Sequence, residues 1–549
     1  MASLLPLQGA LGHRKAAHLL RRSSYRYTRA RVDELAALTA ADALALLLQA
    51  SPPQLEQPVF GAANPKTWIN PPAPPGVVPP AAEFELRPYV MGWWVNEALH
   101  DPGITYKMSF FLHQYLAVDA ESGSSPQFFD YLALLRWGSL GNFKKLIVKM
   151  VTDNCMLGYL DNDQNYKGNP NENFAREFFE LFTIGTGAAA GPGDYTNYTE
   201  EDIMQAARVL TGFNHALRNQ YTDPDTQIPA GKAYPQSHDF DPKTFSPRFN
   251  STVIQPPTND APGMYKELEA LVDMVFEQEE TARNICRRLY HFFVTRSLPD
   301  EVETDIIGGM ANTFKTNNFE LKPVLEQLLQ SEHFFDADDS ANTDEIVGAL
   351  IKSPMELALQ ALTFFDLPIP DPMTDNKKHY VDFYNGAVIE RMLGVSGLTL
   401  FYPFDVAGYS GYYQQPDFNR QFFNSATIIP RYKLPQVLLS GTHAWTGASN
   451  NSIGTKLDIA QWVKDKSGIS DPTDSFVLVR ELLMYLAPEE VSPERLDYFL
   501  QTIFLDNLPA SDWTYEWQNF VTSGNDSEVK IPLERLVNAI LYAPEYQTF

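Results

Sequence analysis

Cysteine is scarce in this chain of 549 residues, which contains only Cys155 and Cys286. Two thiols cannot build the disulfide framework of a small secreted domain. Both cysteines lie in apolar runs typical of helices, so we expect buried free thiols. No run reaches the roughly 18 apolar residues of a membrane helix. The first twenty residues also lack the apolar core of a secretory signal. The protein is therefore either cytoplasmic, or exported with its signal removed or carried by a partner.

Basic residues and familiar catalytic motifs are also few. Lys and Arg number 42 against 68 Asp and Glu, which gives a net charge of −26. Nucleic-acid binding depends on basic patches that release phosphate counterions, so we expect no nucleic-acid partner. The patterns GxxxxGK[ST], GxSxG, HExxH and paired CxxC are missing, which disfavours nucleotide hydrolysis, common serine-esterase chemistry and structural zinc.

Apolar residues with helical spacing dominate the remainder of the chain. Hydrophobic residues make up 44% and aromatic residues 13%, enough for a large core. Periodic apolar positions predict helices along much of the chain. The predicted helices include residues 86–100, 104–118, 143–160, 173–185, 200–213, 265–276, 282–296, 322–335, 352–365, 473–487 and 532–546. We predict a mainly α fold, a large multi-helix globular body with a small irregular insertion that holds short strands.

Shifts in composition suggest where the chain divides. We predict N-terminal helices in residues 1–50, a Pro-rich extended segment in 51–82, a main helical domain in 83–345 and a C-terminal helical lobe in 346–549. The polar insertion near 214–262 interrupts the main domain, and Thr252 to Ile254 are its strand candidate.

The Pro-rich segment and a basic cluster near the N-terminus each suggest a surface role. Proline has no amide donor and a fixed φ, so residues 51–82 cannot form a helix or central strand. Trp68 and Ile69 are expected to anchor this segment. The basic cluster could bind an anion, or it could be a solvated helix face that balances nearby acids, which we favour. Its members are Arg14, Lys15, Arg21, Arg22, Arg26, Arg29 and Arg31.

Several segments together resemble one known family. They are residues 18–28, 110–118, 169–185, 199–213, 237–245, 285–293, 402–418 and 541–547. In this order they resemble the large bacterial family known as domain of unknown function 1800. The resemblance covers most of the chain.

The resemblance implies a helical fold but carries no catalytic residues over to this chain. Members are often encoded beside a second family that is similar to sulfatases and alkaline phosphatases, which implies a protein partner of that kind. Many members carry Trp-His-Asn-His where this chain has Leu112, His113, Gln114 and Tyr115. The second histidine is missing, so a metal site with two histidines is not expected here.

The loop between two predicted helices has the ligand order of a calcium site. Counted from Asp161, oxygen ligands fall at positions one, three, five, seven and twelve, as in a helix–loop–helix calcium site. The predicted ligands are Asp161, Asp163, Asn165, the Lys167 carbonyl and Glu172. The glycine expected at position six is replaced by Tyr166. The alternative, which we favour, is an ordinary loop whose Asn-Pro-Asn-Glu end starts the next helix.

Three polar residues on that next helix form a first candidate for catalysis. Arg176 and Glu180 are four residues apart, the spacing of an ion pair, and Glu177 lies beside them. In a cleft, burial and a nearby arginine would shift the pKa of these carboxyl groups in opposite directions. Such a group could act as a general acid or base. The alternative is a structural ion-pair network.

A second candidate is His238 with Asp239 and Lys243, in a polar region. Histidine exchanges protons near neutral pH, a carboxylate can orient it, and lysine can stabilise negative charge. An imidazole and a carboxylate could also bind a metal. An exposed loop with no function is the alternative.

Other histidines and aromatic residues are expected to be structural. His113 and His291 each lie on an apolar helix face, where a lone histidine is usually a satisfied core residue. The aromatic stretch near residues 400–423 is expected to fill the core. Its noteworthy polar members are Asp405, Tyr412, Asp417 and Arg420.

Two functional hypotheses follow from these patterns. The first is a cation-assisted enzyme, a hydrolase being one form, with calcium as the favoured ion and with a cleft that combines both polar clusters. The second is a non-catalytic binding or scaffold protein that partners a phosphatase- or sulfatase-like protein. It predicts a broad exposed apolar patch, and any bound cation would then be structural.

Overall fold

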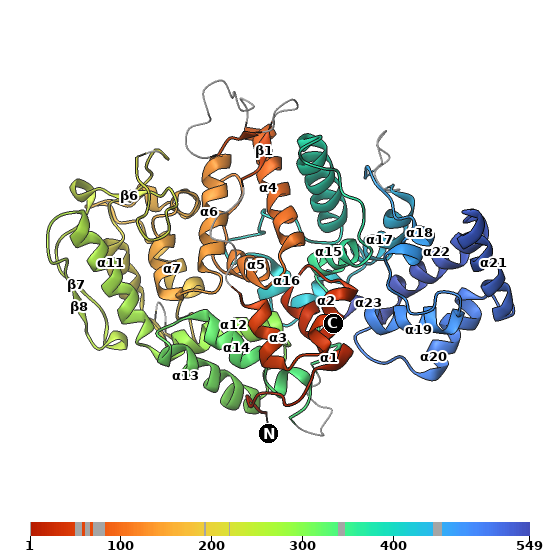
Figure 1. Ribbon diagram of the computed structural model, residues 1–549. Coiled ribbons are helices and arrows are strands. Elements are labelled where there is room, and N and C mark those ends of the chain that lie inside the picture. Colours follow the sequence, from red (N-terminus) through yellow and green to blue (C-terminus); the bar gives the residue numbers. More distant parts are fainter. Residues whose placement is uncertain are drawn as a thin grey trace.

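The computed structural model describes residues 2–49, 57–60, 66–69, 83–191, 194–218, 220–338, 346–442 and 453–549. Helices dominate these residues, and the strands occur only as short antiparallel pairs (Figure 1). The predicted mainly α fold is therefore confirmed. Most of the Pro-rich segment and the predicted boundary at residue 345 lie outside the described residues, and the division into domains stays a prediction.

Fourteen described α-helices lie between residues 12 and 329. They are α1 (Gly12–Ser23), α2 (Arg29–Ala36), α3 (Ala40–Leu47), α4 (Glu83–His100), α5 (Thr105–Tyr115), α6 (Ser125–Gly138), α7 (Phe143–Met150), α8 (Asn154–Tyr159), α9 (Glu172–Glu177), α10 (Glu200–Val209), α11 (Ala261–Phe276), α12 (Glu279–Phe293), α13 (Gly308–Thr316) and α14 (Leu321–Leu329). Residues 143–160, predicted as one helix, are divided because the Asp153 side chain accepts a hydrogen bond from the Met156 amide and starts α8.

The later described α-helices lie between residues 354 and 547. They are α15 (Pro354–Phe364), α16 (Ser410–Tyr413), α17 (Ile428–Ser440), α18 (Ile459–Asp465), α19 (Ser475–Leu486), α20 (Pro493–Asp497), α21 (Ala510–Ser523), α22 (Ser527–Tyr542) and α23 (Pro544–Gln547). Short 3-10 turns are η1 (Asn162–Gln164), η3 (Pro235–Ser237), η4 (Pro247–Phe249), η6 (His333–Phe335) and η8 (Phe418–Phe422). Wider π-helical segments are η2 (Phe178–Phe182), η5 (Val302–Ile307), η7 (Lys377–Gly394) and η9 (Tyr498–Phe504).

Short strand pairs lie between helices, as predicted for the insertion. The strands are β1 (Val59–Phe60), β2 (Lys66–Thr67), β3 (Ala189–Gly191), β4 (Asp194–Tyr195), β5 (Phe213–Asn214), β6 (Lys232–Ala233), β7 (Lys243–Thr244) and β8 (Val253–Ile254). Each odd-numbered strand pairs with the next one in antiparallel register. The strand candidate at residues 252–254 is confirmed as β8, whose partner β7 contains Lys243.

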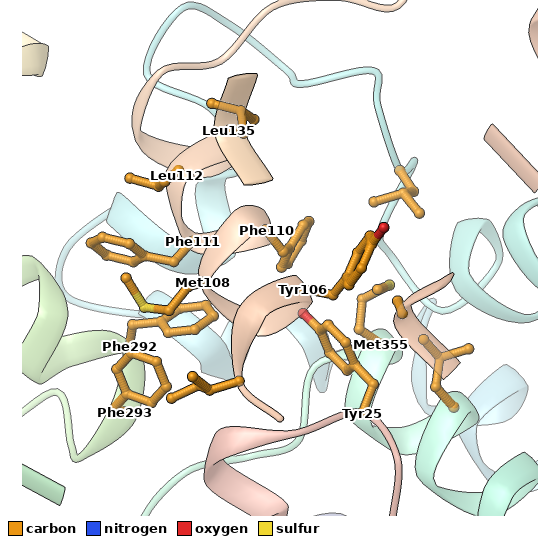
Figure 2. Packing of buried hydrophobic residues seen from close by; sticks show 14 of the residues in the cluster. Tyr25, Tyr106, Met108, Phe110, Phe111, Leu112, Leu135, Phe292, Phe293 and Met355 are labelled. Carbon is orange, nitrogen blue, oxygen red and sulfur yellow. The ribbon is translucent and has the colours of Figure 1, made fainter. Parts of the chain in front are cut away.

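The centre of the core is α5, in which every residue from Thr105 to Tyr115 is buried. A helix enclosed on all sides needs apolar residues around its whole circumference. Figure 2 shows its side chains directed to both flanks, with Phe111 towards Phe292 and Phe110 near Tyr25. The Phe111 and Phe292 ring centroids are 5.3 Å apart. Segments distant in sequence therefore meet around α5.

The N-terminal helices α1, α2 and α3 lie together at the lower centre of the view, and α1 buries most of its second half (Figure 1). We favoured a solvated face for the basic cluster, but Arg21 and Arg22 of α1 are buried. Arg21 donates to the carbonyl oxygens of Tyr485 and Ala487. Arg22 donates to the carbonyl oxygens at 294, 346 and 549. Backbone carbonyls therefore accept from the terminal nitrogens of both guanidinium groups, while the buried Arg22 Nε has no partner among the described residues.

Smaller sequence predictions can also be compared with the structure. Trp68 and Ile69 are buried, 4% and 3% exposed, as expected of anchors for the Pro-rich segment. Cys155 and Cys286 are free and buried, as predicted. Within the described part of the chain, no helix is both long and apolar enough to cross a membrane.

Candidate functional site

Arg176, Glu177 and Glu180 lie where α9 continues into the π-helical segment η2. Arg176 forms a bidentate pair with Glu200 of α10, with N–O distances of 2.8 and 2.7 Å. Glu180 instead accepts a hydrogen bond from the Tyr198 hydroxyl at 2.9 Å. The predicted Arg176–Glu180 ion pair is therefore replaced by two contacts to the chain just before α10 and at its first residue. Single π-helical turns within helices are often found at functional sites.

Glu177 is half-buried and has no hydrogen-bond partner among the described contacts that would stabilise its charge. Burial raises the pKa of its carboxyl group to about 7, helped by the negative charges of Glu180 and Asp405, while Arg176 opposes the shift. A carboxyl group with a pKa near neutrality can exchange protons at physiological pH.

A cavity of about 330 Å³ opens between α5, α12 and the segment around residues 407–418. This volume is within the range of small-molecule sites. Its apolar wall includes Phe111, Phe292 and Phe418. Leu181 of η2 also lines it, and the Asn284 side chain ties α12 to the end of η2 through the Thr183 carbonyl at 2.8 Å.

Asp405, whose negative charge contributes to the raised pKa of Glu177, is hydrogen-bonded at the edge of this cavity. Its carboxylate accepts hydrogen bonds from the Ala407 amide at 2.9 Å and the Tyr413 hydroxyl at 2.6 Å. Both of these residues line the cavity. Leu181, four residues after Glu177, lines it as well, and residues four apart lie close together on a helical surface. The raised-pKa carboxyl and the cavity therefore belong to one region.

The polar wall of the cavity comes from one face of α12. Asn284, Arg287, Arg288 and His291 all line it and recur at the spacing of a helix face. Arg287 is paired with Glu280 and Glu303, at 2.5 and 2.8 Å. The guanidinium of Arg288 instead rests 4.2 Å from the centre of the Tyr115 ring. Arg288 forms no ion pair with any residue that the structure describes.

Arg296, which follows the end of α12, also lines the cavity, and both it and His291 are partly buried. Arg296 donates to the Tyr412 carbonyl at 3.1 Å, and its Nε has no partner among the described residues. Burial lowers the pKa of Arg296 to about 10. Burial, with Arg296 as a second cause, lowers the pKa of His291 to about 4. His291 is therefore neutral at pH 7, and its Nδ1 lies 3.0 Å from the Thr295 carbonyl.

Two residues of α5 that line this cavity, Gln114 and Tyr115, carry buried polar atoms without partners. Their side chains are 8% and 3% exposed. The Gln114 Nε2 and the Tyr115 hydroxyl are shielded from solvent and have no hydrogen-bond partner among the described residues. A buried donor left unsatisfied costs about 1–3 kcal/mol.

His113, next to them on α5, is a satisfied core residue, as predicted. It is fully buried, with Nδ1 2.9 Å from the Tyr131 hydroxyl and Nε2 2.9 Å from the Tyr409 hydroxyl. Burial lowers its pKa to about 3, so the ring is neutral.

The second predicted cluster forms an internal ionic triad. His238 and Lys243 are 1% and 0% exposed, and both contact Glu267 of α11. The His238 Nε2 lies 2.8 Å from one Glu267 oxygen, and the Lys243 Nζ lies 2.6 Å from the other. The His238 Nδ1 lies 2.7 Å from the Thr211 carbonyl. Acceptors therefore occupy both ring nitrogens, and the triad binds the insertion to α11.

The structure separates the six predicted catalytic residues into two groups. Asp239 pairs with Arg208, at 2.8 Å, near the end of α10. Arg176 pairs with Glu200 at the start of α10. Eight residues of helix separate these contacts, about 12 Å at 1.5 Å per residue. None of the six lines the cavity described above, and the group of Arg176, Glu177 and Glu180 is the one that continues directly into a lining residue, Leu181.

The predicted calcium ligands have separate protein partners. Asp161 accepts from the Gln164 amide, and Asp163 lies 3.3 Å from His215. The buried Asn165 side chain bonds to Asn162, to the Ala207 carbonyl and to the Asn171 amide.

The last of these ligands, Glu172, also has a protein partner. Its carboxylate lies 3.5 Å from Arg176. At Lys167, where the carbonyl oxygen is the predicted ligand, the amide donates to the Ser237 carbonyl at 2.8 Å and the ammonium lies 3.9 Å from Asp241. Among the described residues, no group of three or more His, Cys, Asp or Glu side chains is arranged to hold a metal ion. The calcium site at this loop stays a prediction.

Comparison with known proteins supports the resemblance noted from the sequence. The family described as "Protein of unknown function (DUF1800)" matches residues 18–548. The chain belongs to this family. No curated protein and no solved structure matches this DUF1800 chain.

Several important residues of this DUF1800 protein were not singled out from its sequence. The polar positions 284, 287, 288 and 291 fall on one helix face, a periodicity that could have revealed the cavity wall. Glu267 shares the apolar face of α11 with Met264 and Leu271, so helical periodicity also predicts that it is buried. Gln114 and Tyr115 carried no comparable signal, because only the packing of other segments shows that they lack partners.

Proposed function

We propose that this protein is a hydrolase that binds a small molecule in the cavity between α5 and α12 and uses Glu177 as a general base. The observation that carries the proposal is the pKa of about 7 of Glu177, four residues before Leu181, which lines the cavity. A half-ionised carboxyl group can act as a general base on a water molecule that it reaches, and the cavity has the size of a ligand site.

The proposed step transfers a proton from water to the Glu177 carboxylate. The water oxygen forms a bond to the electrophilic centre of the substrate, and the leaving group departs with the electron pair of the broken bond. Arg176 is a positioning residue, because its bidentate pair with Glu200 fixes the helix that carries Glu177. His238, Asp239 and Lys243 are structural in this proposal, and no step uses a cation.

The test measures hydrolysis of 4-nitrophenyl acetate and 4-nitrophenyl phosphate by the purified full chain between pH 5 and 9. The ionised fraction of Glu177 increases as pH rises through about 7. The rate should therefore rise over this interval and level off above it. Glu177→Gln should reduce the rate about 100-fold or more, because general base catalysis typically contributes that much.

Glu201→Gln is the matched control, since it neutralises an exposed carboxyl group on neighbouring α10. Its rate and pH profile should equal those of the wild type. Absence of turnover above the buffer reaction for both substrates contradicts the proposal. Equal rates for Glu177→Gln and wild type contradict it as well.

A second candidate function, protein binding, is supported by an exposed groove between η9, α21 and α22. Leu508, Tyr515 and Ile531 line it and are 57%, 67% and 63% exposed. Asp512 and Glu528 also line it and form no ion pair within the described residues. Exposed apolar side chains beside uncompensated acids fit a basic amphipathic segment of a partner protein.

Fluorescence polarisation with a labelled Leu/Lys amphipathic peptide tests this second candidate. The peptide should bind the full chain, and a peptide with Glu in place of Lys should not. A Tyr515→Ser/Ile531→Ser variant should bind at least ten times more weakly, while Leu217→Ser, which changes an exposed leucine elsewhere, should not alter binding. Equal binding of both peptides, or self-association through this groove, contradicts it.

A further inference from the structure

The cavity wall is positively charged although the protein as a whole is strongly acidic. Its lining includes Arg287, Arg288 and Arg296 but no Asp or Glu. Carboxylates neutralise Arg287, whereas Arg288 and Arg296 form no ion pair within the described residues. Two partly buried guanidinium groups therefore face the cavity without a compensating charge, and such groups favour an anionic ligand.

The unpartnered atoms of the wall are hydrogen-bond donors. They comprise the Gln114 amide nitrogen, the Tyr115 hydroxyl and the Arg296 Nε. An amide nitrogen and a guanidinium nitrogen can only donate, and a hydroxyl can donate. Gln114 and Tyr115 are both more than nine-tenths buried, so bulk water does not satisfy them. The residues that line the cavity therefore carry an excess of hydrogen-bond donors, which favours a ligand rich in acceptor oxygens.

The remaining wall is aromatic. Phe292 and Tyr412 pack with ring centroids 6.0 Å apart, and Arg296 lies over Phe418 at 5.1 Å. Flat apolar groups stack on rings of this kind and beside guanidinium planes. The wall therefore offers one charged side and one flat apolar side to the same molecule.

We infer that the cavity binds an organic oxyanion, a carboxylate or phosphate ester carried on a flat apolar body. The charged group lies against Arg288 and Arg296, and the apolar body lies against Phe292, Tyr412 and Phe418. The inference rests on the proposed function only in assigning this cavity as its substrate site. It names the substrate class of that site.

Isothermal titration calorimetry on the purified full chain tests the inference with four probes. Benzoate and phenyl phosphate combine an oxyanion with a flat apolar body, benzyl alcohol has the body alone, and inorganic phosphate has the charge alone. At least one of the first two should bind ten times or more tightly than both of the others. Affinities of benzoate and phenyl phosphate that both equal the affinity of benzyl alcohol would overturn the assignment of an anion site.

Variants of α12 locate the binding. Arg288→Met removes the charge while keeping a long side chain, and it should weaken binding of the tighter probe at least tenfold. Arg288→Lys should restore part of this loss. Arg283→Met is the matched control, because Arg283 lies on the same helix, pairs with Glu303 and does not line the cavity. It should leave affinity unchanged, and circular dichroism should show each variant folded.

Gln114→Leu provides a second test on a different helix. It replaces a buried donor with an apolar group of similar size, so the apo protein should remain folded while oxyanion binding weakens. Unchanged affinity in both Gln114→Leu and Arg288→Met would overturn the inference.

The two proposals fail in different experiments. Oxyanion binding measured in Glu177→Gln, together with no Glu177-dependent turnover, would refute the hydrolase and leave the binding site intact. Glu177-dependent turnover of a neutral ester without oxyanion binding would refute the ligand class and leave the hydrolase intact.

Discussion

At the scale of single residues, the environment decides what each charged side chain does. His238 and Glu177 were both candidates for proton transfer from their sequence context. Buried acceptors occupy both His238 nitrogens, whereas Glu177 is half-buried, lacks a neutralising partner and has a pKa of about 7. Residue type alone does not separate these cases, because the separation depends on partners distant in sequence.

The triad around Glu267 predicts a large loss of stability on mutation. Glu267→Leu would leave His238 and Lys243 as buried groups without their carboxylate partner. Removing one member of a buried ion pair typically costs about 3–5 kcal/mol. Urea unfolding followed by circular dichroism should show a loss of this size.

Glu269→Leu serves as the control on the same helix. Glu269 pairs only with the exposed Lys266 at the surface, where ion pairs contribute little. Its unfolding curve should nearly match that of the wild type. A Glu267→Leu protein as stable as this control would show that the triad does not hold the insertion to α11.

At the scale of elements, the crossing of α4 and η7 depends on a glycine. A Cβ atom at Gly92 in α4 would overlap the backbone carbonyl group of Tyr380 in η7. Gly92→Ala should therefore destabilise the protein, by about 1–3 kcal/mol as for other overpacked sites. Thermal unfolding measures the effect.

Gly308→Ala in α13 is the corresponding control. A Cβ there would approach no atom closer than 3.4 Å, and alanine favours helix over glycine. Its melting temperature should stay equal or rise. A Gly92→Ala protein with the same melting temperature as Gly308→Ala would disprove the tight crossing.

Much of the helical pattern was predictable from periodicity, and the exceptions have local causes. The apolar spacing of α11 and α12 is strong, with Leu268 and Leu289 among their buried positions. The break between α7 and α8 follows from the Asp153 side chain, and the π-helical segment η2 gave no sequence signal. Capping side chains and hydrogen-bond geometry determine where a helix breaks or widens. The spacing of apolar residues carries no information about that geometry.

At the scale of the whole molecule, the candidate site was only partly predictable. The sequence pointed to Glu177 as a candidate. Asp405, whose negative charge contributes to the raised pKa of Glu177, lies more than 200 residues away in the sequence. The cavity combines α5, α12 and the segment near Tyr412, a juxtaposition that no local pattern encodes. The predicted combination of His238 with Glu177 failed to form because α10 separates their neighbours Arg208 and Glu200.

The loop from Asp161 to Glu172 predicts the response to metal removal. Its side chains already bond to protein partners such as His215 and Arg176, so they are not free to surround a cation. Melting temperature should be the same before and after treatment with excess EGTA, and elemental analysis should find no stoichiometric calcium. A lower melting temperature after chelation would restore the calcium site predicted from the sequence.

The buried arginines of α1 have a consequence for synthesis of the protein. Arg22 bonds to carbonyl oxygens 272, 324 and 527 residues further along the chain. At about 5–20 residues per second, a ribosome needs tens of seconds even to reach the first of them. During that time Arg22 has none of these acceptors, and Arg21 lacks its own at residues 485 and 487, so this helix cannot complete its native contacts while translation of the chain continues.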